Sequence, residues 1–354
     1  MSSNFQSIPI IDLSLANSPA TRSGLLQQLH QALIEVGFLY VSNHEVPQNV
    51  VSDLKEVLPR LFNLDLEHKE KVALYNSPHF LGYSRIGSET TAGVQDQREQ
   101  FEFATELPYT WSEDKPRYER LKGPNQWPRG EPDIRLKVEN FIKELTKLSE
   151  RFLHLVAEAL GIPPDLLFSL LSDQHRLKLV HYPPSDPSTD SIGQGVGPHK
   201  DSSGWWTFLL QASPPNVQGL QALNKNGDWI DIPVIQDTFV VNIGQAFEVV
   251  THGVCKATTH RVLSEPLERF SVPFFQGVRG NLTKSEALDM LKGYLSAELS
   301  SAETDIGANI DSAFLRGKYD TWGESQLRTK IRSHRDVGQR FYGDVFEKYT
   351  EDDS

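Results

Sequence analysis

The chain has 354 residues, 38% hydrophobic and 23% charged, which is typical of a globular protein with a large buried core. Its net charge of −12 argues against a nucleic-acid-binding protein, which would normally carry a basic surface. The single cysteine, Cys255, excludes an intramolecular disulfide and cysteine-based metal sites, and no signal peptide or membrane span is recognisable, so we expect a cytoplasmic protein.

The first half of the chain is predicted to mix helices with a few strands. A glycine, Gly37, is a suitable stop for the first helix. The expected elements are strands at 8–12 and 38–41, helices at about 20–36, 46–62 and 66–74, loops with one strand (100–103) over 75–130, a long helix at about 132–160 and a short helix after residue 162.

From about residue 177 the pattern changes to short β-rich runs separated by turns, which indicates an all-β sandwich or jelly roll. Residues 224–227 form a typical hairpin turn. The expected strands are 177–182, 206–211, 220–223, 229–232, 238–243, 258–263 and 270–275. Helical patterns return after residue 280, near 284–296 and 325–349. We interpret the Arg and Lys residues between 316 and 340 as a solvated helix face, not a polyanion site.

His199 and Asp201 form a candidate metal-binding pair, because alternate residues of an extended segment point to the same side. His260 lies in a β-prone run and could add a third ligand from a distant strand. Two imidazoles and one carboxylate leave about three coordination positions open, an arrangement that suits non-haem Fe(II) activating O2. Zinc accepts the same ligands, but no His-Glu-x-x-His helix or similar motif supplies the general base that a zinc hydrolase would need.

Arg269 and Ser271 would face the same way from one strand. A buried guanidinium is unfavourable unless it is paired, and a dicarboxylate could pair with it through two hydrogen bonds. A structural salt bridge with one of the 47 acidic residues is the alternative. Tyr182 is a candidate hydroxyl donor to the same carboxylate, with a core tyrosine as its alternative.

In this order and spacing, the motifs resemble those of the isopenicillin N synthase-like branch of the Fe(II)/2-oxoglutarate-dependent dioxygenases. The similar segments are 8–13, 37–44, Gly82-Tyr83, Tyr182-Pro183-Pro184, His199-x-Asp201, His260-Arg261-Val262 and Arg269-x-Ser271. Three departures are Val180 in place of a frequent Asn, Gly244-Gln245 in place of a frequent Gly-Asp, and a segment between Asp201 and Thr207 that is about one residue longer than usual.

The resemblance implies a mainly β fold with flanking helices, built on a double-stranded β-helix (jelly roll). We divide the chain into an N-terminal non-haem dioxygenase segment (1–125), connecting helices (126–174), the jelly-roll core (175–280) and a C-terminal helical segment (281–354). The resemblance further implies that His199, Asp201 and His260 are catalytic iron ligands, and that Arg269, Ser271 and Tyr182 bind 2-oxoglutarate.

The implied reaction consumes O2 and 2-oxoglutarate, releases succinate and CO2, and hydroxylates, desaturates or rearranges a small-molecule metabolite, such as one of natural-product biosynthesis. Ascorbate would serve as the reductant in vitro. Two alternatives are a same-fold Fe(II) oxidase that does not use 2-oxoglutarate, with Arg269 and Ser271 binding the carboxylate of its substrate, and a non-catalytic β-barrel binding protein. The motifs leave the substrate, the outcome of the oxidation and the oligomeric state open.

Candidate substrate contacts are side chains expected near the open face of the iron, each with core packing or a surface position as its alternative. They are Phe80, Tyr83, Arg85, Phe101, Phe103, Trp205, Phe247 and Phe275. Arg85 and Arg98 could bind an acidic substrate, although we favour a surface role for both. Lys200 lies between two ligands and is expected to point away from the metal.

Overall fold

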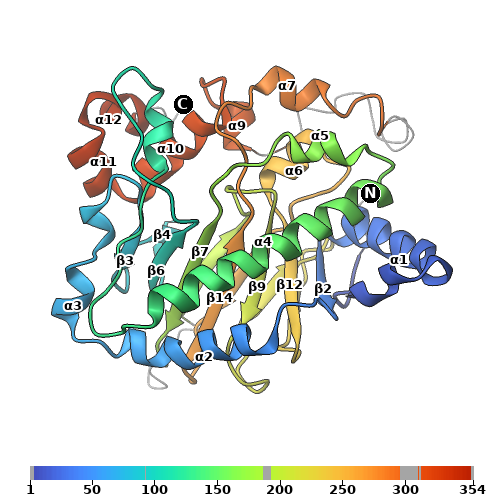
Figure 1. Cartoon of the computed structure of the whole chain (residues 1–354), viewed down its shortest axis with the longest axis horizontal. Coiled ribbons are helices and arrows are strands. Elements are labelled where there is room, and N and C mark those ends of the chain that lie inside the picture. Colours follow the sequence, from blue (N-terminus) through green and yellow to red (C-terminus); the bar gives the residue numbers. More distant parts are fainter. Residues whose placement is uncertain (1–3, 92, 186–192, 296–309, 311, 352–354) are drawn as a thin grey trace.

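The computed structural model describes residues 4–91, 93–185, 193–295, 310 and 312–351 (Figure 1). The strands are β1 (Ile10–Asp12), β2 (Phe38–Ser42), β3 (Gly82–Ser84), β4 (Thr90–Thr91), β5 (Val94–Gln95), β6 (Glu99–Ala104), β7 (Arg176–Tyr182), β8 (Gln194–His199), β9 (Trp206–Gln211), β10 (Leu220–Leu223), β11 (Trp229–Asp231), β12 (Thr238–Ile243), β13 (His260–Leu263) and β14 (Arg269–Phe275).

The helices surround these strands, and most belong to the two ends of the chain. They are α1 (Pro19–Gln31), α2 (Gln48–Phe62), α3 (Leu66–Glu70), α4 (Ile134–Ala159), α5 (Pro164–Phe168), α6 (Gln245–Val250), α7 (Lys284–Asp289), α9 (Ala313–Arg316), α10 (Trp322–Ser333), α11 (Arg335–Phe341) and α12 (Gly343–Thr350). A π-helical turn at Ala32–Val36 and short 3-10 helices at Leu13–Asn17, Leu74–Asn76 and Arg117–Leu121 complete the set.

Two sheets form the centre of the molecule. The larger has eight strands in the order β1-β2-β12-β9-β14-β7-β6-β3, and the smaller has four in the order β11-β10-β13-β8. Strands β4 and β5 pair separately as a ribbon. The chain therefore has the expected mainly β architecture with flanking helices, and the hairpin predicted at 224–227 joins β10 to β11.

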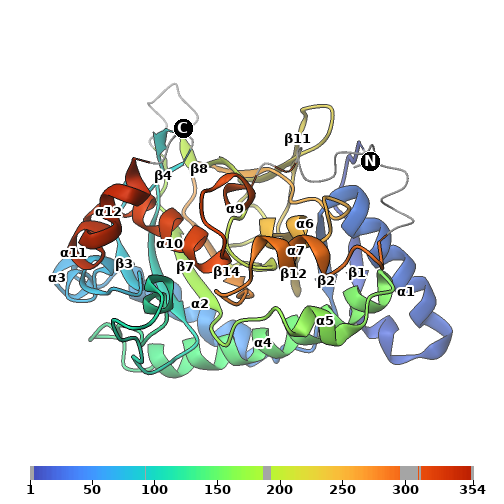
Figure 2. The ribbon, with the colours of Figure 1, turned by 90° about the horizontal axis from the view of Figure 1, so that it is seen from above.

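Helix α4 covers one face of the larger sheet because its apolar residues recur every three or four positions. Val138, Phe141, Leu145 and Phe152 are all fully buried along this stripe. The ring of Phe152 meets that of Trp206 on β9 edge-on, with centroids 5.2 Å apart. Figure 2 shows α4 on one side of the larger sheet and β8 and β11 of the smaller sheet on the other.

Strands from the N-terminal segment extend the larger sheet at both of its edges. At one edge β2 pairs with β12, and β1 pairs with β2. At the other edge β6 pairs with β7, and β3 pairs with β6. The N-terminal segment thus contributes directly to the central sheet, while the four-part division of the chain stays a prediction.

The C-terminal region differs from the single helix that we predicted at 325–349. It consists of α10, α11 and α12, separated by the non-helical residues His334 and Tyr342. The turn at Tyr342 lets its ring stack on Phe80 (centroids 5.8 Å apart) and its hydroxyl donate to the carbonyl of Pro78 at 2.6 Å. Helix propensity alone favours one continuous helix, but the contacts that bury Tyr342 require a break at this residue.

The helix predicted at 284–296 is also shorter, because α7 ends at Asp289; residue 296 lies outside the described residues. Among the described helices, none combines the length and the hydropathy that crossing a membrane would require.

Gly37 is predicted to be essential for stability at the junction between the π-helical turn and β2. Its φ is +70°, and a Cβ there would lie 2.3 Å from the carbonyl oxygen of Lys256 and 2.6 Å from Oγ1 of Thr258. Gly37→Ala should therefore lower the free energy of unfolding by about 1–3 kcal/mol or more, measured by chemical denaturation. Gly24→Ala, at an exposed helix position with no atom within 4 Å of the new Cβ, should instead raise it by about 0.5–1 kcal/mol. Equal effects of the two changes would contradict this account.

Candidate active site

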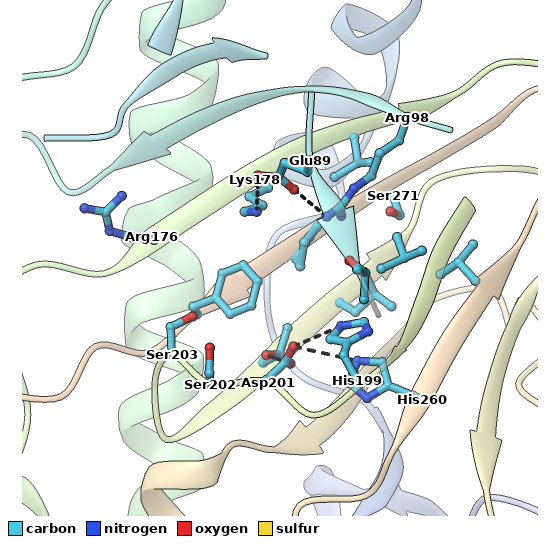
Figure 3. Close-up of a pocket in the computed structure, with 18 of the residues that line it drawn as sticks. Glu89, Arg98, Arg176, Lys178, His199, Asp201, Ser202, Ser203, His260 and Ser271 are labelled. Atoms are coloured by element: carbon cyan, nitrogen blue, oxygen red, sulfur yellow. Dashed lines mark hydrogen bonds and ion pairs between the residues drawn. The ribbon is translucent and has the colours of Figure 1, made fainter. Parts of the chain in front are cut away.

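A cavity of about 290 Å³ lies between the two sheets, at the low end of the volumes usual for small-molecule pockets (Figure 3). The larger sheet lines it with alternate residues of two paired strands, as expected for side chains that share one face. These residues are Arg176, Lys178, Val180 and Tyr182 of β7, and Arg269, Ser271, Pro273 and Phe275 of β14. Helix α10 contributes Gln326, Thr329, Lys330 and Ser333 to the same cavity.

His199, Asp201 and His260 meet in this cavity. Strands β8 and β13 are antiparallel, and His199 lies directly opposite His260 in their register. Asp201 follows β8 by two residues, and its Oδ1 lies 3.6 Å from Nε2 of His199 and 3.7 Å from Nε2 of His260. One ligand atom from each residue lies within 4.8 Å of the others. The three side chains can therefore bind one metal ion from one side.

Backbone carbonyls orient both imidazoles. Nδ1 of His199 lies 2.8 Å from the carbonyl oxygen of Gly197, and Nδ1 of His260 lies 3.1 Å from that of Thr258. Because a carbonyl oxygen only accepts hydrogen bonds, each Nδ1 is the protonated nitrogen, and each Nε2 keeps a free lone pair. Both lone pairs are thus available to a metal beside Asp201.

The Asp201 carboxylate is held by two donors that the sequence analysis missed. Its Oδ2 accepts from Oγ1 of Thr207 at 2.5 Å and from Nδ2 of Asn242 at 2.7 Å. Thr207 on β9 and Asn242 on β12 are cross-strand neighbours. The only signal in the sequence is one polar residue in the interior of each of two mainly apolar strands. With Oδ2 engaged in this way, Oδ1 is left facing the imidazoles.

The protonation states of these groups also suit metal binding. Burial by itself would raise the pKa of the Asp201 carboxyl, but His260, His199 and Thr207 hold that pKa well below its usual range. Burial, reinforced by His199, lowers the pKa of His260 to about 4. At neutral pH the cavity therefore offers a carboxylate and, in His260, a neutral imidazole, which are the forms that bind metals.

Arg269 lies in the same cavity and is almost fully buried. Its guanidinium lies over the ring of Tyr182, 4.8 Å from the centroid, and its Nη2 is 3.5 Å from Oε1 of Gln211. Its Nη1 is buried without a hydrogen-bond partner, and the described residues provide no carboxylate within ion-pair distance. Burial lowers the pKa of Arg269, and Tyr182 partly opposes this effect. A buried cation with so few partners is a suitable site for an anionic ligand.

Neighbouring residues complete this anion site. Tyr182 pairs with Arg269 across β7 and β14, and Ser271 pairs with Val180. The amide nitrogen of Gln211 donates to the carbonyls of Ile232 and Pro233, which leaves its oxygen facing Arg269. Gln211 was not recognised from the sequence. Val180, the cross-strand neighbour of Ser271, makes this part of the cavity wall apolar.

Most of the predicted substrate contacts lie elsewhere. Phe275 lines the cavity, and the other seven side chains do not. Phe101, Phe103, Trp205 and Phe247 are fully buried in the main hydrophobic core. The aromatic residues of β6 face away from the cavity, while Glu102 lines it. All six residues of β6 are buried, so the sequence pattern could not indicate which face of the strand lines the cavity. Phe101 and Phe103 pack in the core, the alternative that we gave for both.

The remaining three candidates have structural roles. Phe80 packs under the C-terminal helices, stacked on Tyr342. The Tyr83 hydroxyl donates to Glu99 at 2.5 Å. Arg85 is exposed and forms an ion pair with Glu70. We therefore leave seven of the eight side chains out of the proposed substrate site.

Two basic residues that we expected at the surface are instead largely buried and line the cavity. Arg98, for which we favoured a surface role, has 14% side-chain exposure and lines the cavity. Lys330, expected on a solvated helix face, has 16% side-chain exposure, and its Nζ donates to Glu102 at 2.6 Å. By contrast, Lys200 forms an ion pair with Glu248 at 3.1 Å, and none of the described triad atoms is its partner.

Comparison with known proteins agrees with this geometry. A family model described as "non-haem dioxygenase in morphine synthesis N-terminal" matches residues 8–130, and one described as "2OG-Fe(II) oxygenase superfamily" matches residues 174–278. The chain is 40% identical to the 2-oxoglutarate-dependent dioxygenase frbJ of Dothideomycetidae sp. (strain 11243), over 96% of this chain and 92% of that protein. It is 31% identical to a homoarginine-6-hydroxylase of Glycine max, over 78% of this chain and 86% of that protein.

Solved structures have the same fold. A full-length Neurospora crassa protein solved in complex with alpha-KG superposes with a TM-score of 0.68 at 22% identity, covering 97% of this chain and 98% of that one. JOX2 in complex with 2OG, Fe and JA superposes with a TM-score of 0.64 at 26% identity, covering 79% of this chain and 82% of that one.

Asn242 provides a test of the metal centre that leaves all three candidate ligands in place. Asn242→Leu removes one of the two donors that orient the Asp201 carboxylate, so we expect metal affinity to fall about 10- to 100-fold, measured by calorimetric titration with Mn(II). The matched control is Gln221→Leu, which removes an amide that donates to Asp231 at 2.8 Å on the surface. The control should bind Mn(II) like the wild type. Unchanged affinity in a folded Asn242→Leu protein would contradict the role assigned to this amide.

Proposed function

Since the chain belongs to the 2OG-Fe(II) oxygenase superfamily, we propose that it uses Fe(II), 2-oxoglutarate and O2 to oxidise a small-molecule metabolite. One observation carries this proposal. A triad with the geometry of a metal site and a buried arginine that lacks a carboxylate partner among the described residues line the same cavity. The triad provides for the metal, and the arginine provides for the far carboxylate of the cosubstrate.

In the proposed site, His199, Asp201 and His260 hold Fe(II) through Nε2, Oδ1 and Nε2. When bound, the iron supplies the activation of O2 and of the keto acid. The two backbone carbonyls that accept from the imidazoles, together with Thr207 and Asn242, keep the three ligand atoms turned toward one point. Because Gly197, Thr207 and Asn242 lie on strands and Thr258 immediately precedes one, the ligands are positioned before the metal arrives.

Arg269, Ser271 and Tyr182 hold 2-oxoglutarate in this proposal. Arg269 offers the unsatisfied Nη1 to the carboxylate farthest from the metal, and Gln211 keeps the guanidinium oriented. Val180, Val196 and Leu209 line the cavity nearby and exclude water from this ion pair. Exclusion of water strengthens a charge-assisted hydrogen bond.

The proposed stoichiometry follows from the cosubstrate. One atom of O2 enters succinate as 2-oxoglutarate loses CO2, and the other oxidises the substrate by hydroxylation, desaturation with release of water, or ring rearrangement. A role in natural-product biosynthesis is supported by the description of the N-terminal family model, which refers to morphine synthesis. The net charge of −12 supports an enzyme of small molecules with no nucleic-acid partner.

The experiment that tests this function measures succinate in reactions containing the protein, Fe(II), ascorbate, O2 and 2-oxoglutarate, with and without metabolite extracts. Succinate that forms slowly alone and faster with an extract would support it. Tight metal binding without any loss of 2-oxoglutarate would instead favour the same-fold oxidase, in which Arg269 and Ser271 bind the substrate's own carboxylate. Absence of both activities would favour a binding protein.

Arg269→Leu is expected to raise the KM for 2-oxoglutarate about 10- to 100-fold, because hydrogen bonds to a charged group contribute about 1.5–3 kcal/mol. Succinate formation at increasing 2-oxoglutarate concentration measures this change. Mn(II) affinity should stay at the wild-type value, since Arg269 does not contact the triad. Arg135→Leu, which removes an exposed arginine paired with Glu139 on α4, should leave the KM unchanged. An equal KM in both variants would exclude Arg269 from the cosubstrate site.

A further inference from the structure

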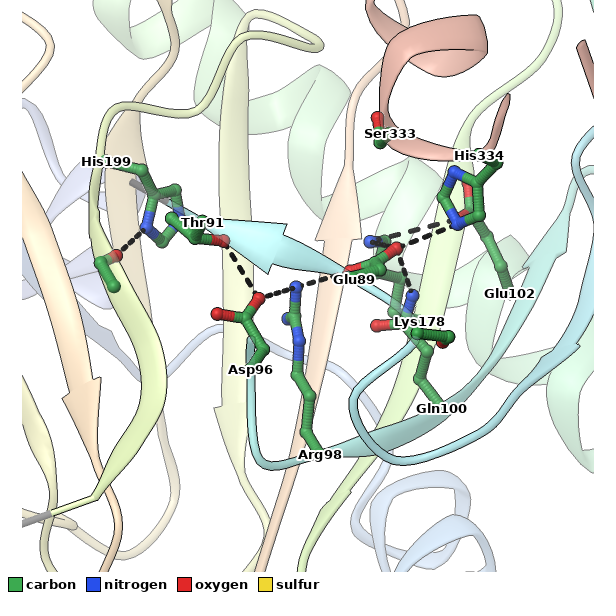
Figure 4. A network of polar contacts seen from close by, with 12 residues as sticks. Glu89, Thr91, Asp96, Arg98, Gln100, Glu102, Lys178, His199, Ser333 and His334 are labelled. Atoms are coloured by element: carbon green, nitrogen blue, oxygen red, sulfur yellow. Dashed lines mark hydrogen bonds and ion pairs between the residues drawn. The ribbon is translucent and has the colours of Figure 1, made fainter. Parts of the chain in front are cut away.

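The active-site cavity contains a second group of charged side chains that neither the metal nor the cosubstrate uses. We call it the charged wall and define it as Glu89, Arg98, Glu102, Arg176, Lys178 and Lys330, all of which line the cavity. Figure 3 shows Glu89, Arg176 and Lys178 across the cavity from the triad, and Figure 4 shows the polar contacts around Glu89. Charges gathered in a partly buried site are unfavourable unless they are paired or serve a ligand.

Both carboxylates of the wall have close partners other than Lys178. Glu89 accepts from Arg98 at 2.6 Å and from Gln100 at 2.8 Å, and Nε2 of His334 lies 3.1 Å from it (Figure 4). Oε1 of Glu102 accepts from Arg176 and from Lys330, each at 2.6 Å. Glu89 and Oε1 of Glu102 are thereby paired within the protein, whereas Oε2 of Glu102 is buried without a hydrogen-bond partner.

Three of the four cations are similarly committed. Arg98 also contacts the buried Asp96 at 3.2 Å. Arg176 donates to the backbone carbonyls of Phe80, His79 and Leu121 in addition to Glu102. Lys330 donates to Glu102. Each of these three cations thus donates a hydrogen bond to a carboxylate, while Nε of Arg98 is buried without a hydrogen-bond partner.

Lys178 is the exception. Its Nζ lies 3.7 Å from Oε1 of Glu89 and 3.8 Å from Oε2 of Glu102, beyond the length of a hydrogen bond. Within the described ranges no hydrogen bond from this ammonium is found, although an ammonium can donate three. Its side chain is 17% exposed and lines the cavity between Arg176 and Val180 on β7. The ammonium thus has donor capacity directed at the cavity.

The balance of charges around Lys178 indicates the charge of a ligand that would bind there. Four cations (Arg98, Arg176, Lys178 and Lys330) face three carboxylates (Glu89, Glu102 and Asp96), which leaves one positive charge in excess. Burial lowers the pKa of Lys330 to about 8, and Arg176 and Lys178 add to this effect although Glu102 opposes it. A ligand with a single negative charge would balance the wall, whereas a cationic ligand would increase the excess.

The partner of Lys178 is distinct from the anion assigned to Arg269. Tyr182, which pairs with Arg269, lies four residues along β7 from Lys178, about 13 Å between the two backbone positions at the usual rise per residue. Arg98 lies between the two groups, since it also interacts with Tyr182. Helix α10 adds polar side chains to the cavity at three- and four-residue spacing, namely Gln326, Thr329, Lys330 and Ser333. This helix lies outside both family-model matches, which end at residues 130 and 278.

We propose that Lys178 binds a carboxylate group of the substrate that is oxidised, so that this enzyme acts on small organic acids. The proposal rests on the function proposed above, because it assumes that 2-oxoglutarate occupies the Arg269 end of the cavity. The wall then acts as a specificity site: Glu89 and Glu102 hold Lys178 between them, and the substrate's carboxylate replaces these long contacts with a direct hydrogen bond to the ammonium.

The test compares two probes of nearly the same size and shape, 3-phenylpropionate, which ends in a carboxylate, and 3-phenylpropanamide, which ends in a neutral amide. Each is titrated under nitrogen into the full-length protein loaded with Fe(II) and saturating 2-oxoglutarate, and binding is followed by perturbation of the charge-transfer absorption of the loaded metal. We expect the wild type to bind the carboxylate at least 10-fold more tightly than the amide. This preference should be lost in Lys178→Met and largely kept in Lys178→Arg.

Two controls separate this proposal from the function on which it rests. Lys147→Met removes an exposed lysine of α4 paired with Glu144 and should keep the wild-type preference. The KM for 2-oxoglutarate, measured by succinate formation, should be unchanged in Lys178→Met, which also shows that the variant is folded. A carboxylate preference that survives in Lys178→Met, or no preference in the wild type, would overturn the proposal while leaving the function intact. Failure of the wild type to consume 2-oxoglutarate would instead overturn the function.

Discussion

The pairing of β8 with β13 is the constraint on which the active site depends. It places His199 opposite His260, and the turn after β8 returns Asp201 to the same point. Thr207 and Asn242 from the larger sheet then hold the Asp201 carboxylate. The triad therefore connects the two sheets, and its geometry depends on the correct formation of both.

The second constraint is the alternation of side chains along β7 and β14. From Tyr182 to Arg176 every second residue of β7 faces the cavity, so one strand contributes to the Arg269 anion site at one end and the charged wall at the other. The committed arginines and carboxylates form a rigid frame around Lys178. In the proposed arrangement the cosubstrate and the substrate bind to different cations of one cavity, Arg269 and Lys178.

Sequence reasoning located the triad and the Arg269 site because these residues occur in local motifs of fixed spacing. It failed for the substrate side. Phe101 and Phe103 on β6 are core residues, whereas Glu102 between them lines the cavity. A strand that is buried on both faces carries no periodic signal that distinguishes them. Arg98 and Lys330 were misplaced because charged residues are usually exposed, and only their partners Glu89 and Glu102 make burial tolerable.

The sequence by itself determined the class of chemistry, because the candidate metal ligands and the arginine proposed to bind an anion are recognisable by residue type and local spacing. It also determined the mainly β architecture through its short, regularly spaced apolar runs. Only the tertiary structure decided which donors orient Asp201, which face of β6 lines the cavity, and that Lys178 lies between two carboxylates with hydrogen bonds to neither. These contacts join segments far apart in the chain, such as β6, β7 and α10, and their distances depend on packing that no local pattern encodes.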